Sequence, residues 1–393
     1  MEKTRYITKH IQDDLKKKMI FIGGPRQVGK TTLAQSIGHS AYSGKTMYLN
    51  WDYPDHQKII IKRQFNPSDT LLIFDELHKY RPWRNYIKGL YDVRKKAVNI
   101  LITGSARLDF YRRGGDSLQG RYHYYRLHPF SLGELLGAMP SIEPFTELVP
   151  LERASGARQW FELLAQFGGF PEPLFAQDMN TLRRWQNERM DRMIREDIRD
   201  IELVRDISSM QTLSHILPEK VGGLFSLNAL REDLQVTHKA VALWVDIFER
   251  FYYHFRIPPF TGKVMRSLKK QPKLYLWDWS TVSDDGARFE NMIASHLLKF
   301  VHYMWDTTGH RAELFFLRDT DGHEVDFLVA VNRKPWFMVE TKHSSRTLSR
   351  HMRYFKDTLC IPFAYQIVRN RDVHYLQDDI HVMSADVFLS GLV

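Results

Sequence analysis

The chain has 393 residues, of which 43% are apolar and 26% are charged. These fractions are ordinary for a folded globular protein and exclude wholesale disorder and the fibrous classes. The length corresponds to about two or three domains. Basic residues outnumber acidic residues by 56 to 46, so the formal net charge is +10. This excess favours a polyanionic partner, either nucleic acid or the anionic face of a membrane.

Cysteine and histidine usage bounds the chemistry further. The single cysteine, Cys360, rules out a disulfide within the chain and a CxxC zinc site. The 17 histidines show no HExxH or other paired spacing, so a zinc enzyme is not expected. No apolar run approaches the roughly 18 residues that span a bilayer, and residues 1–10 lack the apolar stretch of a secretion signal. We therefore expect a cytoplasmic protein.

The first part of the chain alternates short apolar segments with amphipathic stretches, which is typical of a parallel α/β sheet covered on both faces. We predict four strands and one clear helix in it, at residues 19–24, 46–50, 71–75, 99–104 and 83–96. An N-terminal domain over residues 1–135 follows from this pattern.

From about residue 131 the strand signal fades and helical periodicity dominates, most clearly at 160–167 and 183–201. Gly168 to Pro171 predicts a break between helices. From residue 273 the pattern predicts strands again, with one helix, at residues 274–278, 286–302 (the helix), 314–317, 324–331, 336–341 and 363–368. We therefore predict a helical middle domain over 136–272 and a second α/β domain over 273–393.

The segment GPRQVGKT fits the phosphate-binding pattern GxxxxGK[ST] without a mismatch. It follows a predicted strand and precedes a predicted helix, which is the context that this motif requires. Its glycines let backbone N–H groups curl around phosphate oxygens, and the helix N-terminus adds a favourable dipole. Lys30 would reach the β- and γ-phosphates as a catalytic group, and the Thr31 hydroxyl would ligate Mg²⁺. The predicted nucleotide-binding residues here are Gly24, Pro25, Arg26, Gln27, Val28, Gly29, Lys30, Thr31 and Thr32.

Two acidic residues at the end of the predicted strand 71–75 support a nucleotide site. Asp75 would hold Mg²⁺, directly or through water, and Glu76 is placed to polarise the attacking water. The alternative is that two acids end a buried strand by chance. Because both halves of the site are present, we predict ATP binding, with hydrolysis dependent on how Glu76 is aimed.

Polar and basic side chains follow the predicted strand 99–104. Thr103 and Ser105 would be placed to contact the γ-phosphate, although simple capping of the strand end explains them equally well. Four arginines come next, at Arg107, Arg112, Arg113 and Arg121. One of them could stabilise transition-state charge as an arginine finger, while the others are more simply surface charge.

A carboxylate cluster is predicted near the C-terminus, where Asp326 lies in GHEVDF and Glu340 and Lys342 lie in FMVETK. Side chains alternate along a strand, so Glu340 and Lys342 share a face, and a hairpin would bring them to Asp326. Two carboxylates beside a lysine can hold Mg²⁺ and orient a water for phosphodiester attack. Glu290, on the preceding predicted helix, would add a fourth group. The alternative is a solvated hairpin, but acids within core-like strands usually have a function.

Residues 226–251 are predicted to form two helices joined by a short turn. A basic segment, 262–272, follows with Lys263, Arg266, Lys269 and Lys270 and no acid. A helix pair followed by a basic hairpin would be a winged helix, whose second helix enters a DNA groove. The alternative is a core helix pair followed by a solvated basic loop.

Taken together, these segments resemble prokaryotic AAA-type ATPases that carry a carboxy-terminal domain of unknown function numbered 4143. Each short piece is unspecific, whereas the set covers nearly the whole chain in the order of that family. The segments that carry the resemblance are GPRQVGKTTL, YLNWD, LLIFDELHKY, ILITGSAR, GRYHYYRLHPFSLGEL, GGFPEPL, residues 226–251, KLYLWD, GARFEN, EVDF and ETK.

The resemblance implies an α/β protein with an AAA-like P-loop ATPase domain, a winged helix-turn-helix middle and a C-terminal PD-(D/E)XK nuclease-like fold. Arg121 falls in the GR pattern of the family and is implied as the catalytic arginine. The nuclease-like quartet maps onto Glu290, Asp326, Glu340 and Lys342. Such folds also persist as DNA-binding modules that do not cut.

The leading hypothesis is an ATP- and Mg²⁺-dependent ATPase associated with DNA, with DNA cleavage at the C-terminal site by Mg²⁺ or Mn²⁺. The alternative is a nucleotide-controlled switch that binds DNA or a protein and cuts nothing. A membrane-surface ATPase would need a basic amphipathic helix, and the sequence contains no convincing one. We expect ATP and DNA as partners and no membrane, and self-association is left open.

Overall fold

The computed structural model describes residues 3–94, 97–104, 118–138, 142–150, 154–198, 206–261, 270–344 and 347–393. The chain divides into two compact units, Met1–His128 and Pro129–Val393.

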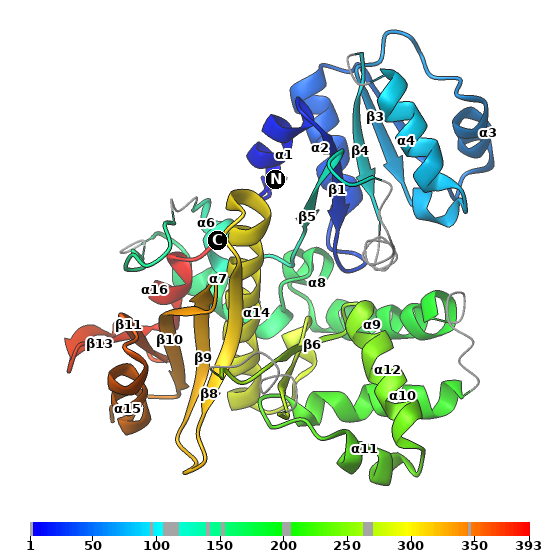
Figure 1. Ribbon diagram of the computed structural model, residues 1–393. Coiled ribbons are helices and arrows are strands. Elements are labelled where there is room, and N and C mark those ends of the chain that lie inside the picture. The colour runs from blue at the N-terminus through cyan, green and yellow to red at the C-terminus, as the bar shows by residue number, and fades with distance from the viewer. Residues whose placement is uncertain are drawn as a thin grey trace. The chain divides into compact units, whose positions relative to one another are not determined.

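The first unit is built on a five-stranded parallel sheet with the strand order β2-β3-β4-β1-β5 (Figure 1). Its strands are β1 (Met19–Gly23), β2 (Thr46–Asn50), β3 (Leu71–Asp75), β4 (Asn99–Thr103) and β5 (Tyr122–Arg126). The four predicted strands are confirmed to within one residue. The edge strand β5 was not predicted, because its sequence YHYYR lacks an apolar run. In the structure most of its residues are only half-buried.

Helices cover both faces of this sheet, as the apolar strands require. The helices are α1 (Thr8–Leu15), α2 (Lys30–Tyr42), α3 (Pro54–Lys62) and α4 (Trp83–Arg94), with a short 3-10 helix η1 (Leu77–Lys79) after β3. α1 and α2 lie on one face, and α3 and α4 lie on the other (Figure 1). Because side chains alternate along a strand, Phe21 and Phe74 pack with Trp83 in the core on the α3 and α4 side.

The first half of the second unit is helical, as predicted. Its helices are α6 (Leu132–Leu136), α7 (Ala157–Phe167), α8 (Pro171–Ala176), α9 (Met179–Arg192), the π-helix η2 (Met193–Ile198), α10 (Ile207–Ile216), the 3-10 helix η3 (Leu217–Lys220), α11 (Leu227–Leu234) and α12 (His238–Arg250). Among the described residues, no helix combines the length and apolar character that a membrane-spanning segment needs.

A two-stranded sheet follows α12. In it, β6 (His254–Ile257) pairs antiparallel with β7 (Lys273–Leu276). The segment 274–278 was predicted as the first strand of the C-terminal α/β domain. In the structure, β7 instead pairs with β6 in this separate sheet. An apolar sequence such as LYL predicts a buried strand but carries no information on its partner, which tertiary packing decides.

The rest of the second unit is a six-stranded mixed sheet with the order β12-β13-β11-β10-β9-β8. Its strands are β8 (Ala312–Arg318), β9 (Glu324–Val331), β10 (Lys334–Lys342), β11 (Phe363–Val368), β12 (His374–Gln377) and β13 (Ile380–Ser384). The predicted strands correspond to β8 to β11. β12 and β13 were not predicted, since β12 is exposed throughout and β13 is short.

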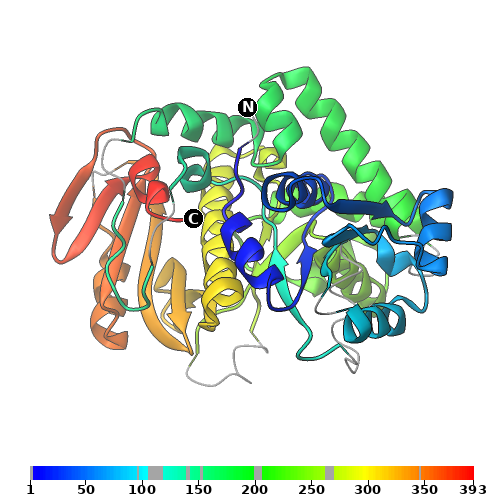
Figure 2. The same cartoon turned by 90° about the horizontal axis from the view of Figure 1, so that it is seen from above.

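Three further helices pack on this sheet, α14 (Asp285–Thr308), α15 (Arg350–Leu359) and α16 (Ala385–Ser390). α14 and α15 lie on opposite faces, which both views show (Figures 1 and 2). α14 extends the predicted helix 286–302 at its C-terminal end and reaches 24 residues.

Lys299 and His296 are two of the polar side chains on the buried side of α14, and both are paired. Lys299 donates to Glu134 Oε2 at 2.5 Å and to Ser131 Oγ at 2.8 Å. His296 Nε2 accepts from the Leu132 N–H at 3.1 Å, while its Nδ1 lies 2.8 Å from the Met292 carbonyl oxygen. This geometry requires the neutral Nδ1–H tautomer, because a protonated ring would direct an N–H at the Leu132 N–H.

We expect acid to destabilise the second unit through His296. Burial lowers the pKa of His296 to about 4 from its ordinary 6.5, so the unfolded chain takes up a proton first as pH falls. Stability present above pH 6.5 should then be lost between about pH 6.5 and 4, by up to about 1.4 kcal/mol per pH unit. The measurement is the midpoint of urea unfolding, followed by tryptophan fluorescence, at pH 7 and pH 5.

The variant His296→Gln serves as the control, because its amide can donate to Met292 and accept from Leu132 without titrating. It should lose less of its urea midpoint between the two pH values than the wild type. An equal loss in both proteins would contradict this role for His296.

Candidate functional site

The loop between β1 and α2 has the curled backbone that the phosphate-binding motif predicts. Gly24, Gln27 and Gly29 all have positive φ, at +142°, +61° and +95°, and α2 begins at the next residue, Lys30. An ideal Cβ on Gly24 would lie 2.4 Å from the Leu127 carbonyl oxygen, so only glycine fits there. The loop therefore leads directly into a helix N-terminus, which is an anion-binding arrangement.

Lys30 lies against this loop. Its side chain is buried, and its Nζ donates to the carbonyl oxygens of Gly24 at 3.0 Å and Pro25 at 2.6 Å. The ammonium is therefore held at the loop that would surround a phosphate, as the sequence predicts.

Asp75 is the centre of the polar contacts at the carboxyl edge of the sheet. Its Oδ2 accepts from Thr31 Oγ1 at 2.7 Å and from the Tyr48 hydroxyl at 2.8 Å, and its Oδ1 accepts from Thr103 Oγ1 at 2.6 Å. Burial, and then the charge of Asp75, raises the pKa of Tyr48, so its hydroxyl remains a donor. The Thr31 hydroxyl and the Asp75 carboxylate form an oxygen donor set that fits Mg²⁺.

Glu76 follows directly and is held in a left-handed conformation with φ +54°. Its Oε2 lies 3.4 Å from His78 Nε2 and 3.6 Å from Lys79 Nζ and finds no hydrogen-bond donor among the described residues. Burial raises the pKa of Glu76, and the charge of Lys79 partly opposes this. A carboxylate with a raised pKa and an uncommitted oxygen suits a group that polarises water.

Two residues that were not predicted from the sequence form hydrogen bonds at the nucleotide site, one to the loop and one to Asp75. The Arg5 guanidinium donates to the carbonyl oxygens of Val28 at 2.8 Å and His128 at 2.5 Å. Tyr48 is the second, through its bond to Asp75. Neither residue belongs to the motif, and no local signal marks them, because their contacts come from distant parts of the chain.

Arg121 does not lie at this loop. It precedes β5, and its carbonyl oxygen accepts from the N–H of Met19, at the amino end of β1. In a parallel sheet that end is about 13 Å from the nucleotide loop. Its guanidinium is paired with Asp92 at 2.8 and 3.2 Å. The family pattern that implied Arg121 carries no geometry, which explains the difference.

Thr103 is fully buried and bonds to Asp75, whereas Ser105, Arg107, Arg112 and Arg113 lie outside the described residues. The same holds for Lys263, Arg266 and Lys269 of the basic segment.

The second unit carries the carboxylate cluster, and the predicted hairpin is present. β9 pairs antiparallel with β10, so that Asp326 lies beside Glu340. The Thr341 N–H and hydroxyl donate to Asp326 Oδ2 at 2.9 and 2.7 Å, and the Asp326 N–H donates to Glu340 Oε2 at 3.3 Å. Lys342 Nζ lies 2.7 Å from Glu340 Oε1. The three side chains therefore come together as expected.

Two residues of β7 enter the same cluster and were not predicted. Lys273 Nζ lies 2.7 Å from Glu324 Oε1, 3.5 Å from Asp326 Oδ1 and 3.6 Å from Glu290 Oε1. The Tyr275 hydroxyl donates to Glu290 Oε1 at 2.7 Å. They were missed because β7 was assigned to the C-terminal sheet and not to a hairpin with β6.

The charges of the cluster shift its pKa values strongly. Burial, and then the charge of Asp326, raises the pKa of both Glu290 and Glu340. Burial alone would lower the pKa of Lys273, but the charges of its carboxylate neighbours outweigh it, and the pKa is raised. Lys273 is therefore an ammonium at neutral pH.

These carboxylates do not fit the predicted metal site. The oxygens of Glu290, Asp326 and Glu340 do not all lie within 4.8 Å of one another. Side chains that could hold a metal do lie this close together elsewhere among the described residues. A cation, the Lys273 ammonium, already lies among the carboxylates of Glu290 and Asp326.

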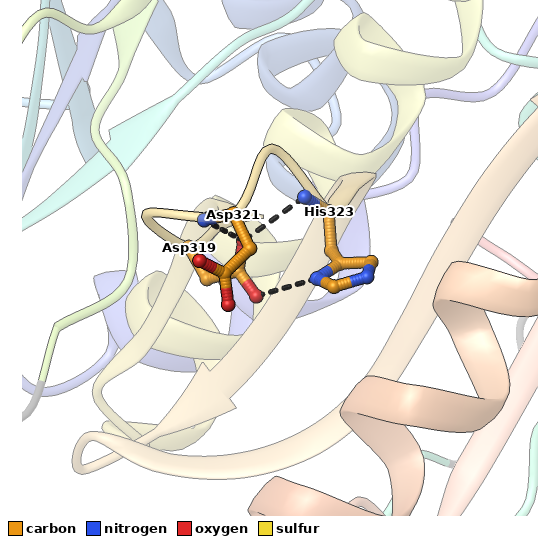
Figure 3. A group of neighbouring side chains, drawn as sticks. All are labelled: Asp319, Asp321 and His323. Carbon is orange, nitrogen blue, oxygen red and sulfur yellow. Dashed lines mark hydrogen bonds and ion pairs between the residues drawn. The ribbon is translucent and has the colours of Figure 1, made fainter.

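Among the described residues, the side chains that lie this close together are Asp319, Asp321 and His323, in the loop between β8 and β9 (Figure 3). Their possible ligand atoms all lie within 4.8 Å of one another. His323 Nδ1 lies 2.7 Å from Asp319 Oδ2, and the backbone N–H groups of Asp321 and His323 both donate to Asp319 Oδ1 at 2.9 Å. The His323 ring stacks on Tyr354. These internal bonds account for the arrangement as a stabilised turn.

Family models match three successive segments of the chain. A model described as an AAA domain matches residues 16–136. Two models of domains of unknown function, DUF8612 and DUF4143, match residues 158–283 and 285–388. The first unit therefore resembles an AAA-type P-loop domain, in agreement with its parallel sheet and the geometry of its phosphate-binding loop. The DUF8612 match continues through β7 and ends just before α14.

Relatives match across most of the chain. The uncharacterized protein MJ1544 of Methanocaldococcus jannaschii is 23% identical over 380 residues, which cover 91% of this chain and 82% of the relative. A second protein of that organism, the uncharacterized protein MJ1637, is 23% identical over 339 residues, or 75% and 70% of the two chains.

Among solved structures, the Thermotoga maritima RuvB Holliday junction branch migration motor matches with a TM-score of 0.31 and 14% identity, over 67% of this chain and 93% of that chain. A likeness this weak has no bearing on the function of this chain.

Replacing Gly24 with alanine should weaken ATP binding about ten-fold or more, because the new Cβ meets the Leu127 carbonyl oxygen and displaces the loop. The measurement is titration of the full chain with a fluorescent ATP analogue.

The matched control is Gly44→Ala. Gly44 also has a positive φ, of +80°, but no described atom lies within 4 Å of its ideal Cβ. This control should lower stability by about 1 kcal/mol and leave nucleotide affinity unchanged. Equal affinities for the two variants would show that the close approach at Gly24 does not matter for binding.

Proposed function

We propose that this chain is a Mg²⁺-dependent ATPase whose nucleotide state controls a DNA-handling second unit. The observation that carries the ATPase part is the convergence of Thr31, Tyr48 and Thr103 on Asp75, beside the half-buried Glu76. The three hydroxyls hold this carboxylate at the carboxyl edge of the sheet, and one of them belongs to Thr31 of the phosphate-binding motif.

Each residue of the site has a defined task in this proposal. The backbone N–H groups of residues 24–31, except at Pro25, and the Lys30 ammonium bind the β- and γ-phosphates of ATP. Thr31 and Asp75 supply the oxygens that hold Mg²⁺, which neutralises charge on those phosphates. Glu76 accepts a proton from the attacking water, and its raised pKa brings it closer to neutral pH.

Two substitutions should separate binding from hydrolysis. Lys30→Ala should abolish both ATP binding and turnover, because it removes the cation at the loop. Glu76→Gln should keep ATP affinity but reduce turnover by about 100-fold or more, because the amide cannot accept a proton. ATP binding and phosphate release are measured on the same preparations.

The control is Lys58→Ala, which removes an exposed lysine of α3 that pairs only with Asp55 among the contacts known for it. It should behave as the wild type. Unchanged turnover in Lys30→Ala would contradict the assignment of the nucleotide site.

DNA association is supported by the net charge of +10 and by the order of elements in the second unit. α11 and α12 form the predicted helix pair, and the β6–β7 hairpin follows them, as in a winged helix. His238 and Lys239 are exposed at the amino end of α12. The acids on α12, Asp246 and Glu249, both form ion pairs with Arg256.

Cleavage of DNA and binding without cleavage remain two versions of this proposal. The hairpin that brings Asp326, Glu340 and Lys342 together supports the cutting version. The ammonium of Lys273 among the carboxylates favours the alternative, a nucleotide-controlled switch that binds DNA or a protein and cuts nothing. We propose the switch on this basis.

We expect DNA binding to depend on α12. Lys239→Glu should weaken binding to a duplex several-fold and reduce the salt dependence of the affinity by about one phosphate contact. Fluorescence anisotropy with a labelled duplex at two salt concentrations measures both quantities. Lys16→Glu, an exposed lysine of the first unit, is the control and should have a smaller effect.

The same preparations are incubated with linear and supercoiled DNA, with Mg²⁺ or Mn²⁺ and with and without ATP. The switch predicts no cleavage under any of these conditions. Cleavage by the wild type that is lost in Lys342→Ala would establish the nuclease version instead.

A further inference from the structure

Lys273 lies where the carboxylates of α14 and β9 converge. We propose that its ammonium is the resident cation of this cluster, and that it fixes the β6–β7 hairpin to the C-terminal sheet and keeps Mg²⁺ and Mn²⁺ out. Removing it should convert the cluster into a divalent-cation site. The inference refines the non-cutting version of the proposed function and does not depend on ATP hydrolysis.

The position of Lys273 is the first reason. It is only 3% exposed, although lysine is rarely buried unless its charge is paired. Its Nζ lies within 3.6 Å of carboxylate oxygens from Glu290, Glu324 and Asp326. A single ammonium therefore bridges α14 and β9, as a metal shared between two elements would.

The second reason is that the carboxylate oxygens are already engaged. Glu324 Oε2 lies 2.7 Å from Arg318, Asp326 Oδ2 accepts two bonds from Thr341, and Glu340 Oε1 pairs with Lys342. Mg²⁺ requires oxygens at about 2.0–2.1 Å in a near-octahedral set. To bind between these oxygens it would have to displace Lys273, because the ammonium already occupies that position.

The third reason is charge. The cluster has the carboxylates of Glu290, Glu324, Asp326 and Glu340, and the cations Lys273 and Lys342 face it together with Arg318. With Lys273 removed, Glu290 and Asp326 would lose the one cation within 4 Å that the described contacts give them. A buried pair of carboxylates without a cation is unfavourable, so a divalent ion would be strongly attracted.

Lys342 is the natural comparison. Its side chain is 44% exposed, and its close contact is with Glu340 alone among the described ion pairs. It lies at the rim of the cluster, so its removal leaves Lys273 in place. β7 also has an anchor besides Lys273, since Asn291 of α14 exchanges two 2.8 Å hydrogen bonds with the backbone of Leu276. The hairpin should therefore survive a substitution at residue 273.

The test is titration of the nucleotide-free full chain with Mn²⁺, with free Mn²⁺ followed by electron paramagnetic resonance. The proteins compared are the wild type, Asp326→Asn, Lys273→Met, the double variant of these two substitutions, and Lys342→Met. Any binding at the Asp319, Asp321 and His323 turn is common to all five and cancels in the comparison. ATP turnover of each protein is measured separately, so a failed ATPase assignment is distinguishable.

We expect no Asp326-dependent Mn²⁺ binding in the wild type or in Lys342→Met. Lys273→Met should gain one Mn²⁺ per chain, bound at least ten-fold more tightly than any site in the wild type, and the double variant should lose it. Asp326-dependent binding in the wild type would overturn the proposal, as would a folded Lys273→Met that gains no site. If Lys273→Met folds only with metal, its refolding yield must rise with Mn²⁺, and a yield that stays at zero overturns the proposal as well.

Discussion

The first unit depends on one carboxylate, that of Asp75, which accepts hydrogen bonds from three hydroxyls on three other elements. Thr31 begins α2, Tyr48 lies in β2 and Thr103 ends β4, so these bonds join the carboxyl ends of the parallel strands at one point. In a parallel sheet such ends share an edge, and ligands bind there. The same carboxylate thus joins α2, β2 and β4 at this edge and belongs to the donor set that would hold Mg²⁺ in the proposed function.

In the second unit, two buried lysines have different roles. Lys299 and Lys273 are both almost fully buried, and each is paired with carboxylates. The Lys299–Glu134 pair joins α14 to α6. Lys273 instead enters a cluster with an excess of carboxylates, and this excess is what makes a cation necessary there. Both lysines are almost fully buried, so burial does not distinguish them. What differs is the ratio of carboxylates to cations, and an excess of carboxylates gives a cluster the capacity to bind a cation.

Much of the nucleotide site could be predicted because its residues are local in sequence. Gly24 to Thr31 form a continuous motif, and Asp75 ends an obvious strand. Arg5 and Tyr48 could not be predicted, since they reach the site through tertiary contacts that no pattern encodes. Arg121 shows the converse, because a family pattern suggested a role for a residue that lies at the other end of the sheet.

The C-terminal cluster divides in the same way. The alternation along β9 and β10 was sufficient to place Asp326, Glu340 and Lys342 together. The alternation could not predict Lys273, because Lys273 lies in β7. This strand pairs with β6 and precedes β9 and β10 in the chain. The predicted chemistry of a metal-dependent cluster therefore rested on an incomplete set of charges.

The pairing of β6 with β7 also bears on how this architecture can be divided. The hairpin spans the predicted boundary at 272/273, and Lys273 and Asn291 attach its second strand to α14. A fragment that starts at residue 273 would leave one edge of β7 without its backbone partners. A fragment that stops at 272 would leave β6 without its partner strand β7. The boundary at 272/273 therefore cuts through a folded hairpin, and a fragment that keeps this part of the second unit intact must contain both β6 and β7.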